Sequence, residues 1–221
     1  MIVAAYFWRI DARKIPFALL RMALDRRVLR RSKGVTFAKL LGCGKGETFT
    51  PADADPRRWG FLICIDEDEL NNFDQSRLVT RWRKNSTSEF RALLETISSH
   101  GKWSNRQPFI AKINSHGGQV VAITRARIKW WQNFRFWKAV PPVTSSLKES
   151  EGLISAIGIG EAPIGLQGTF SLWQSSQALK EFAYNGKAHQ SAIMATQKHR
   201  WYSEELFARF AVKEIRGQIL D

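Results

Sequence analysis

The first half of the chain opens with a strand-like hydrophobic run that is followed by a helical stripe. Residues Ile2 to Ile10 form an apolar, β-rich run that predicts a buried strand. Asp11 is placed to cap a helix and Gly34 to end it, after a basic tract that suits a helix C-terminus. The helical period predicts one buried face on this helix, formed by Ile15, Leu19, Met22 and Ala23.

Two further strands and a second helix follow in this half. Residues 35–41 and 59–65 are apolar runs that predict strands, and a glycine-rich turn over residues 42–46 follows the first of them. Asp66 and Glu69 have the spacing of a capping box, which predicts that a helix begins there.

The second half repeats this order of signals. Residues 120–128 predict a strand, and residues 130–138 predict a helix that two prolines end. Residues 153–159 and 169–173 predict two strands separated by a Gly-Ile-Gly-Glu turn. A serine at position 175 or 176 is expected to cap the next helix.

Strand–helix–strand–strand–helix–strand, found twice, is the ferredoxin-like plan. We therefore predict an α+β fold of tandem ferredoxin-like repeats, with residues 1–112 as the first repeat and 119–221 as the second. Two such antiparallel sheets, placed face to face, would close a barrel with an apolar interior. The closure could occur within one chain or between the chains of a homodimer, and two unrelated α+β modules are the alternative.

Composition and charge narrow the class of protein. Of the 221 residues, 44% are hydrophobic and 12% aromatic, which favours a packed core over disorder. Two cysteines exclude a disulfide framework and a cysteine-rich zinc site. The net charge of +14 indicates an anionic partner, such as nucleic acid, a membrane surface or an acidic metabolite. No signal peptide and no spanning run is found, so a cytoplasmic protein is expected, with peripheral contact at the inner face of the membrane as an option.

Few catalytic motifs are present, and the four histidines carry most of the remaining options. The sequence holds no P-loop, dinucleotide fingerprint, serine-hydrolase elbow or zinc-protease motif. His100, in Ser-Ser-His-Gly, is typical of a helix C-terminus, while His116 and His199 are expected on the surface.

His189 differs because it falls on a predicted helical stripe of small and apolar residues, with Ala192, Ile193 and Thr196. A lone histidine on such a stripe is usually a core residue with a satisfied hydrogen bond. Small neighbours also let a flat macrocycle approach the helix, and neutral imidazole binds iron well. An axial haem ligand is therefore the alternative interpretation.

Residues 158–210 combine several distinctive motifs at fixed offsets. They are Gly158-Ile-Gly-Glu-Ala-Pro, Gln167-Gly-Thr-Phe-Ser-Leu-Trp, Phe182-Ala-Tyr, His189 four residues before Ile193, and Trp201-Tyr-Ser-Glu-Glu-Leu-Phe-Ala-Arg-Phe. Upstream motifs agree: Arg21-Met-Ala-Leu-Asp-Arg, Phe37-x-Lys-Leu-Leu-Gly, Thr48-Phe-Thr-Pro, Gly101-Lys-Trp-Ser and Thr124-Arg-Ala-Arg. In these segments, from about residue 21 to 210, the chain resembles the spheroidene monooxygenase family, carotenoid ketolases of carotenoid-producing bacteria.

The resemblance implies a haem-dependent oxygenase with a dimeric α/β-barrel-like architecture. Such an enzyme inserts oxygen from O2 at an activated methylene of a linear carotenoid, using electrons from a ferredoxin-like donor. Because a carotenoid resides in membranes, the basic surface is also expected to contact anionic headgroups or the electron donor.

The resemblance also suggests site residues. It implies His189 as the proximal iron ligand, with Ile193 beside it on the same stripe. The other candidates are the partners of the haem propionates (Arg125, Arg127, Arg209), a donor to iron-bound oxygen (Tyr184) and the lining of the pocket (Phe170, Trp173). For the arginines, a solvated basic face is the alternative; for the aromatic residues, it is simple core packing.

Two rival functions keep the predicted fold. One is a haem- or hydrophobe-binding relative that acts on a different substrate or only carries it. The other, which we expect less, is an RNA-binding module, because Arg57-Arg58-Trp59-Gly60-Phe61-Leu62 loosely resembles a basic-aromatic RNA-binding strand.

Overall fold

The structure of the chain is a computed structural model, which describes residues 1–114, 116–132, 137, 141, 144–162, 167–185 and 202–219. The predicted helix at residues 130–138 lies mostly outside the described residues, apart from a short 3-10 turn at Trp130–Gln132. The predicted stripe with His189, Ala192, Ile193 and Thr196 lies wholly outside them.

The first repeat follows the predicted order. Its elements are β1 (Ile2–Ile10), α1 (Ile15–Arg31), β2 (Val35–Gly44), β3 (Ala54–Ile65), α2 (Leu70–Asp74), α3 (Arg77–Asn85) and β4 (Ser86–Gly101). Asp11 accepts a hydrogen bond from the backbone N–H of Arg13, as expected of a cap, although a 3-10 turn precedes α1. Gly34 follows α1 with a φ of 74°, a left-handed conformation that favours glycine.

The second repeat contains β5 (Val120–Ile128), β6 (Leu153–Gly160), β7 (Gly168–Trp173), α5 (Ser176–Asn185) and β8 (Tyr202–Arg216). The hydroxyl of Ser175 accepts the backbone N–H of Ala178, which confirms the predicted serine cap of α5.

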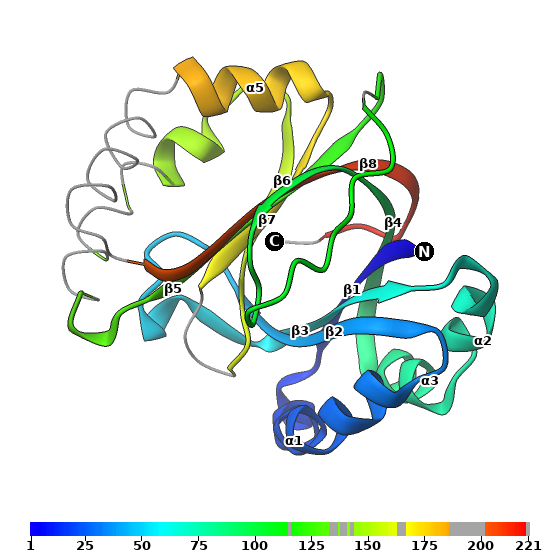
Figure 1. The fold of residues 1–221 in the computed structure, drawn as a ribbon. Coiled ribbons are helices and arrows are strands. Elements are labelled where there is room, and N and C mark those ends of the chain that lie inside the picture. The colour runs from blue at the N-terminus through cyan, green and yellow to red at the C-terminus, as the bar shows by residue number, and fades with distance from the viewer. Residues whose placement is uncertain are drawn as a thin grey trace.

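The eight strands form one closed antiparallel barrel in the order β1-β3-β2-β6-β7-β5-β8-β4. Each repeat therefore supplies four adjacent strands, and the two sheets join where β2 pairs with β6 and where β4 pairs with β8. In Figure 1, α1, α2 and α3 lie on one outer side of the barrel and α5 lies on the opposite side. The predicted tandem ferredoxin-like fold is confirmed, and the barrel closes within a single chain.

Three apolar layers follow from the alternation of side chains along the strands. The barrel interior is packed with 22 buried residues, among them Phe7, Phe90, Phe170 and Phe210. On the outer face of the first repeat, 19 buried residues pack beneath the helices, whereas only four of the described residues form the corresponding cluster of the second repeat. The two outer faces are therefore covered very differently by the described residues.

The predicted buried stripe of α1 is wrong at two of its four positions. Leu19 is 45% exposed and Ala23 is exposed, and the buried residues of the helix are Ala18, Asp25 and Leu29. Asp25 can be buried because its carboxylate accepts hydrogen bonds from Arg21, Arg81 and Trp82. A pattern of apolar residues cannot identify a buried carboxylate, so the prediction placed the core-facing side of α1 incorrectly.

Other local predictions also need correction. His100 is in the long strand β4, not at a helix end, and it pairs with Phe207 of β8. Asp66 makes no side-chain capping hydrogen bond. Gly42 and Gly44 belong to strand β2, where they pair with β6, so only Gly46 lies in the predicted turn.

The strand that resembles an RNA-binding motif is part of β3. Trp59 and Phe61 are each 1% exposed and belong to the core beneath the first-repeat helices. Their rings are therefore covered and offer no face on which a base could stack. None of the described helices is both long and apolar enough to cross a membrane.

Candidate functional site

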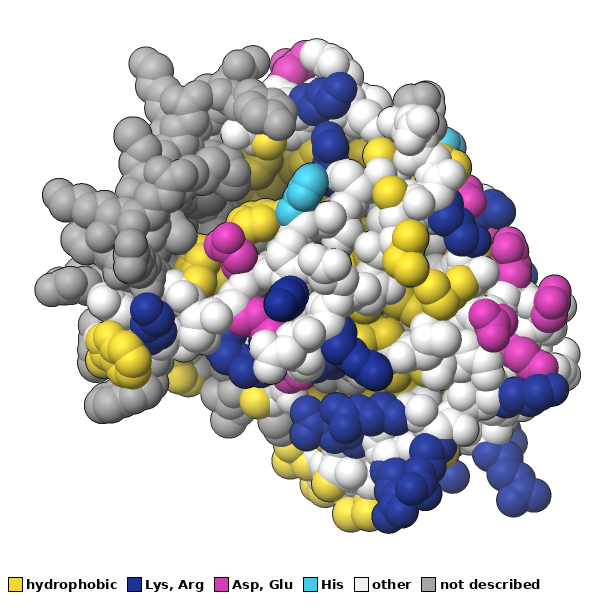
Figure 2. All heavy atoms as spheres, in the orientation of Figure 1, with side chains coloured by type: hydrophobic (Ala, Val, Ile, Leu, Met, Phe, Trp, Pro, Cys, Tyr) yellow, Lys and Arg dark blue, Asp and Glu magenta, His cyan; other side chains and the backbone are white. Residues whose placement is uncertain are grey.

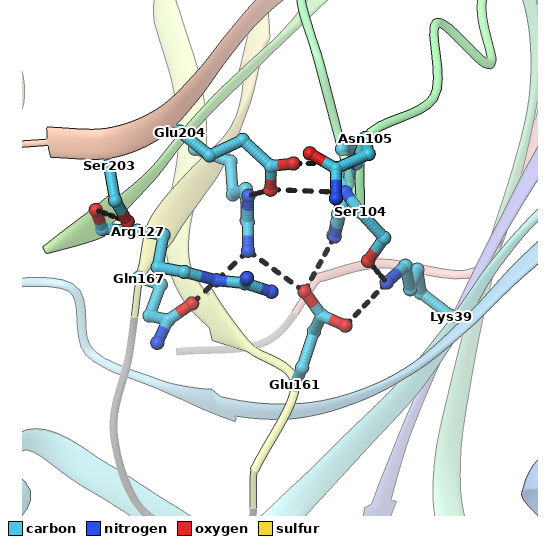
Figure 3. Close-up of polar contacts among 10 residues, drawn as sticks. Lys39, Ser104, Asn105, Arg127, Glu161, Gln167, Ser203 and Glu204 are labelled. Carbon is cyan, nitrogen blue, oxygen red and sulfur yellow. Dashed lines mark hydrogen bonds and ion pairs between the residues drawn. The ribbon is translucent and has the colours of Figure 1, made fainter.

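Charged side chains converge inside one end of the barrel, where Figure 3 shows Lys39, Glu161 and Glu204, and Arg125 forms ion pairs with both glutamates. Lys39 comes from β2, Arg125 from β5 and Glu204 from β8, while Glu161 directly follows β6. Each of these side chains is on the same face as the interior residues of its strand, since alternate residues of a strand share a face. We call these four residues, with Trp103, Ser104, Asn105 and Gln167, the barrel-end network.

Arg125 is the hub of the barrel-end network and is only 2% exposed. Its Nη1 donates to Glu204, and its Nη2 lies 3.0 Å from Oε1 of Glu161 and 3.4 Å from Oε1 of Gln167. Its guanidinium also lies 5.5 Å from the centre of the Trp103 ring. Arg125 therefore links Glu161 and Gln167 to Glu204 at the beginning of β8.

The carboxylate of Glu204 is held by backbone as well as by Arg125. The N–H groups of Ser104 and Asn105 donate to it at 3.0 and 2.7 Å. These two residues have φ values of 54° and 60°, so both have a left-handed backbone. Two non-glycine residues adopt a left-handed backbone here because that conformation directs both N–H groups to one carboxylate.

Lys39 is almost fully buried, with 4% of its side chain exposed. Its ammonium donates to Oε2 of Glu161 and to the hydroxyl of Ser104, each at 2.5 Å, and lies 5.6 Å from the centre of the Trp103 ring. The indole N–H of Trp103 donates to the other oxygen of Glu161 at 2.7 Å. Two cations and two carboxylates thus neutralise one another where water is excluded.

The environment of the barrel-end network shifts the pKa of three of its members. Burial lowers the pKa of Lys39, and the hydrogen bond to Glu161 offsets part of that effect. Burial alone would raise the pKa of Glu161, but hydrogen bonds from Lys39 and Trp103 outweigh it and lower the pKa. Glu204 behaves in the same way, because the N–H groups of Asn105 and Ser104 and the Arg125 guanidinium overcome burial and lower its pKa.

We expect these lowered carboxylate pKa values to make the fold acid-sensitive. Glu161 and Glu204 bind protons less readily in the folded than in the unfolded chain, so their stabilisation is complete above the ordinary glutamate pKa of about 4.3 and is lost below it. Urea unfolding over a series of pH values should show this fall, and Glu204→Gln should reduce its steepness. Glu205→Gln, an exposed neighbour on the other face of β8, should keep the full steepness. Equal pH dependence in Glu204→Gln and the unchanged protein would contradict the prediction.

The structure places the three predicted propionate partners on two faces of the sheet. Arg125 and Arg127 share the inward phase of β5, but Arg125 is buried in the barrel-end network whereas Arg127 is exposed beyond it. Arg209 lies on the outer face of β8 and pairs with Ala122 of β5, and its Nε donates to the Ser98 hydroxyl at 2.9 Å.

The predicted pocket residues are divided in the same way. Phe170 fills the barrel interior, with its ring centre 5.0 Å from that of Phe7. Trp173 lies on the outer face under α5, with its ring centre 5.4 Å from that of Phe182. Tyr184 belongs to the last turn of α5, and both His189 and Ile193 lie outside the described residues. The roles assigned to these residues stay predictions.

The outer face of the second repeat carries small side chains in adjacent rows. Ala122, Ser171 and Ala156 form one row across β5, β7 and β6, and Thr124 and Thr169 pair in the next row. We call these five residues the small-residue floor. All but Ser171 are partly exposed, and Arg209 of β8 borders the first row.

The described residues contain no cluster of three or more histidine, cysteine, aspartate or glutamate side chains that could hold a metal ion. Cys43 and Cys64 are buried and unpaired, and burial raises the pKa of Cys64 to about 12, so its thiol stays protonated. A cavity of about 490 Å³ lies elsewhere, beside Asp74, Arg91 and Arg216. Its arginines already form ion pairs with Asp74, Glu89 and Glu214.

The architecture defines the class of protein. A single closed barrel built from two ferredoxin-like repeats is a dimeric α/β-barrel fold fused in one chain. An aldoxime dehydratase solved with butyraldoxime has the same fold, with a TM-score of 0.59 and 12% identity over 96% of this chain and 79% of that one. A second aldoxime dehydratase structure gives a TM-score of 0.57, with 10% identity over 96% of this chain and 82% of that one.

Sequence relatives identify the family within this class. The chain is 34% identical over 208 residues to spheroidene monooxygenase of Rhodobacter capsulatus, covering 92% of this chain and 86% of that protein. It is 35% identical to that of Rubrivivax gelatinosus, over 83% of this chain and 71% of the relative. It is 33% identical to that of Cereibacter sphaeroides, over 80% of this chain but only 55% of that longer relative. The chain belongs to the spheroidene monooxygenase family and is a monooxygenase. No protein-family model matches it.

The barrel-end network was not predicted as a unit, although most of its residues belong to motifs that the sequence analysis names. Six of the segments that carry the family resemblance each supply one or more of its residues, which are Lys39, Trp103 with Ser104, Arg125, Glu161, Gln167 and Glu204. One sequence signal could have predicted this network. It is a charged residue at a strand position whose neighbours two residues away are apolar and face the interior.

Proposed function

We propose that this protein inserts oxygen from O2 into a linear carotenoid, in a ketolation of the spheroidene type. The observation that carries the proposal is the 34% identity to a spheroidene monooxygenase over 92% of the chain. The apolar wall that Trp173 and Phe182 form on the outer face agrees with a long hydrocarbon substrate.

We propose haem as the cofactor, held on the outer face of the second repeat. The barrel interior does not suit it, because the Phe7, Phe90 and Phe170 rings pack against one another there. The small-residue floor suits a flat macrocycle better, because alanine, serine and threonine side chains rise little above a sheet. When bound, haem would supply the activation of O2, which amino-acid side chains cannot provide.

The residues proposed to hold haem come from the family resemblance and from this placement. The resemblance implies that His189 would ligate the iron, with Ile193 on the same predicted stripe, and both belong to the segment between α5 and β8. Arg209 borders the small-residue floor and can pair with a propionate. Arg125 and Arg127 have the inward phase of β5, and the terminal nitrogens of Arg125 already bind carboxylates, so neither lies on the face proposed for haem.

The chain's own residues would shape the reaction around that group. The ring of Phe182 in α5 packs against the ring of Trp173 in β7, and the two rings would exclude water from the substrate. The Tyr184 hydroxyl, one residue before the end of α5, is proposed to donate a hydrogen bond at the site of oxygen activation. A ferredoxin-like donor, being acidic, would be attracted to the net charge of +14.

The experiment that tests the cofactor is an absorption spectrum of the protein produced with haem supplied. We expect a Soret band that His189→Ala abolishes and that His100→Ala, a control at the exposed end of β4, retains. A band that survives in His189→Ala would overturn the ligand assignment. The absence of a band from the unchanged protein would overturn haem dependence.

The substrate is tested separately, by incubating the loaded protein with spheroidene, a reductant and isotopically labelled O2. We expect labelled oxygen in a ketocarotenoid product, detected by mass spectrometry. A haem-loaded protein that binds spheroidene without forming this product would indicate a relative with another substrate or a carrier.

A further inference from the structure

Helix α1 exposes an unusual amount of apolar surface. Of the eight large hydrophobic side chains that are exposed among the described residues, four lie on this one helix. Leu20, Leu24 and Val28 are 57%, 52% and 51% exposed, and Leu19 is 45% exposed. The first three are spaced four residues apart, so they form a continuous ridge along one side of the helix. This ridge faces away from the core, which α1 contacts through Ala18 and Leu29.

The same side of α1 is strongly basic. Arg27 and Arg31 lie seven and eleven positions after Leu20, which places them on the same side of the helix. Arg26 and Arg30 flank them and are also exposed. The one acidic residue of α1, Asp25, is fully buried against Arg21, Arg81 and Trp82. In Figure 2, hydrophobic and basic side chains adjoin along the lower edge of the molecule, where Figure 1 draws α1.

We propose that this side of α1 docks on the surface of a lipid bilayer that contains anionic headgroups. An amphipathic helix binds there by burying apolar side chains at the boundary between headgroups and acyl chains, while arginines contact the phosphates. Leu20, Leu24 and Val28 supply the apolar part, and the arginines after them supply the cations. Each part of the face then meets a matching part of the bilayer.

A bilayer fits this face better than two other occupants. A second copy of the chain would bring one group of arginines against another or against leucines, and neither contact neutralises the charge. An acidic protein would match the arginines but would leave the leucine ridge without a partner. Only an anionic interface offers a hydrocarbon layer and a negative layer along the same helix.

The inference goes beyond the proposed function and does not depend on it, because no haem or carotenoid is involved in the contact. For an enzyme whose substrate is dissolved in the bilayer, this contact would also hold the barrel at the membrane surface. Lipid binding and carotenoid oxygenation can therefore fail or succeed separately, and each has its own measurement.

The test is co-sedimentation of the full chain with vesicles. We expect binding to vesicles of equal parts phosphatidylglycerol and phosphatidylcholine, and at least about tenfold weaker binding to phosphatidylcholine alone. Leu20→Gln/Leu24→Gln should weaken binding to the anionic vesicles by about tenfold or more, and Arg27→Glu/Arg31→Glu should do the same at low salt. Ile110→Gln, at a side chain 68% exposed but off α1, is the matched control and should bind normally.

Since the substituted side chains are exposed, all variants should keep the circular dichroism spectrum and melting temperature of the unchanged protein. Equal binding to both kinds of vesicle, or anionic binding that the α1 variants do not weaken, would overturn the proposal. A dimer in analytical ultracentrifugation that Leu20→Gln/Leu24→Gln dissociates would also overturn it, because a second copy would then cover the face.

Discussion

Replacing Arg125 by alanine is expected to lower the free energy of unfolding by about 3–5 kcal/mol. The guanidinium is 2% exposed and binds both Glu161 and Glu204. Removing it leaves two carboxylates inside the barrel with Lys39 as the remaining cation of the network, so a larger part of their desolvation is no longer compensated. Urea unfolding monitored by tryptophan fluorescence measures the loss.

Arg127→Ala is the matched control, because Arg127 lies on the same strand and in the same inward phase but is exposed. Its effect should stay within about 0.5 kcal/mol. Adding Glu204→Gln to Arg125→Ala should cost less than the sum of the two single losses, since one of the stranded charges is removed. Strict additivity, or equal effects of Arg125→Ala and Arg127→Ala, would show that the barrel-end network does not stabilise the fold.

Replacing Phe170 by alanine is expected to cost about 3–5 kcal/mol, the usual range for truncating a buried phenylalanine. Phe170 is fully buried, and its ring packs edge-on against Phe7 and Phe90, so the interior cannot collapse easily into the space left behind. Denaturant unfolding measures the loss. Thr169→Ala, next to it but on the outer face, should change stability by less than about 1 kcal/mol.

Variants at the same two positions, Phe170→Ala and Thr169→Phe, separate the two faces of the sheet as haem sites. If haem lies on the small-residue floor, folded Phe170→Ala keeps the Soret band, whereas Thr169→Phe, which fills the floor, loses it. The opposite pattern would place the haem inside the barrel and would contradict its proposed position.

Much of the architecture could be predicted from the chain because strands of a half-buried or fully buried sheet have a readable pattern. The apolar runs at residues 2–10, 120–128 and 169–173 agree with β1, β5 and β7 to within a residue. The fourth strand of each repeat escaped assignment. The pairing of β4 with β8 shifts register twice, at Leu93/Leu94 and at Thr96/Ser98 of β4, and such shifts interrupt the regular alternation that identifies a strand.

The sequence by itself therefore determined the order of elements, the twofold repeat and the family, because these depend on local periodicity and on residue types at fixed offsets. Tertiary structure alone decided which charges are buried. Asp25 faces the core because Arg21, Arg81 and Trp82 converge on it, and Arg125 lies inside the barrel because two distant glutamates neutralise it. Burial of a charge depends on partners brought from other elements, and no periodicity within a single segment records where those partners will lie.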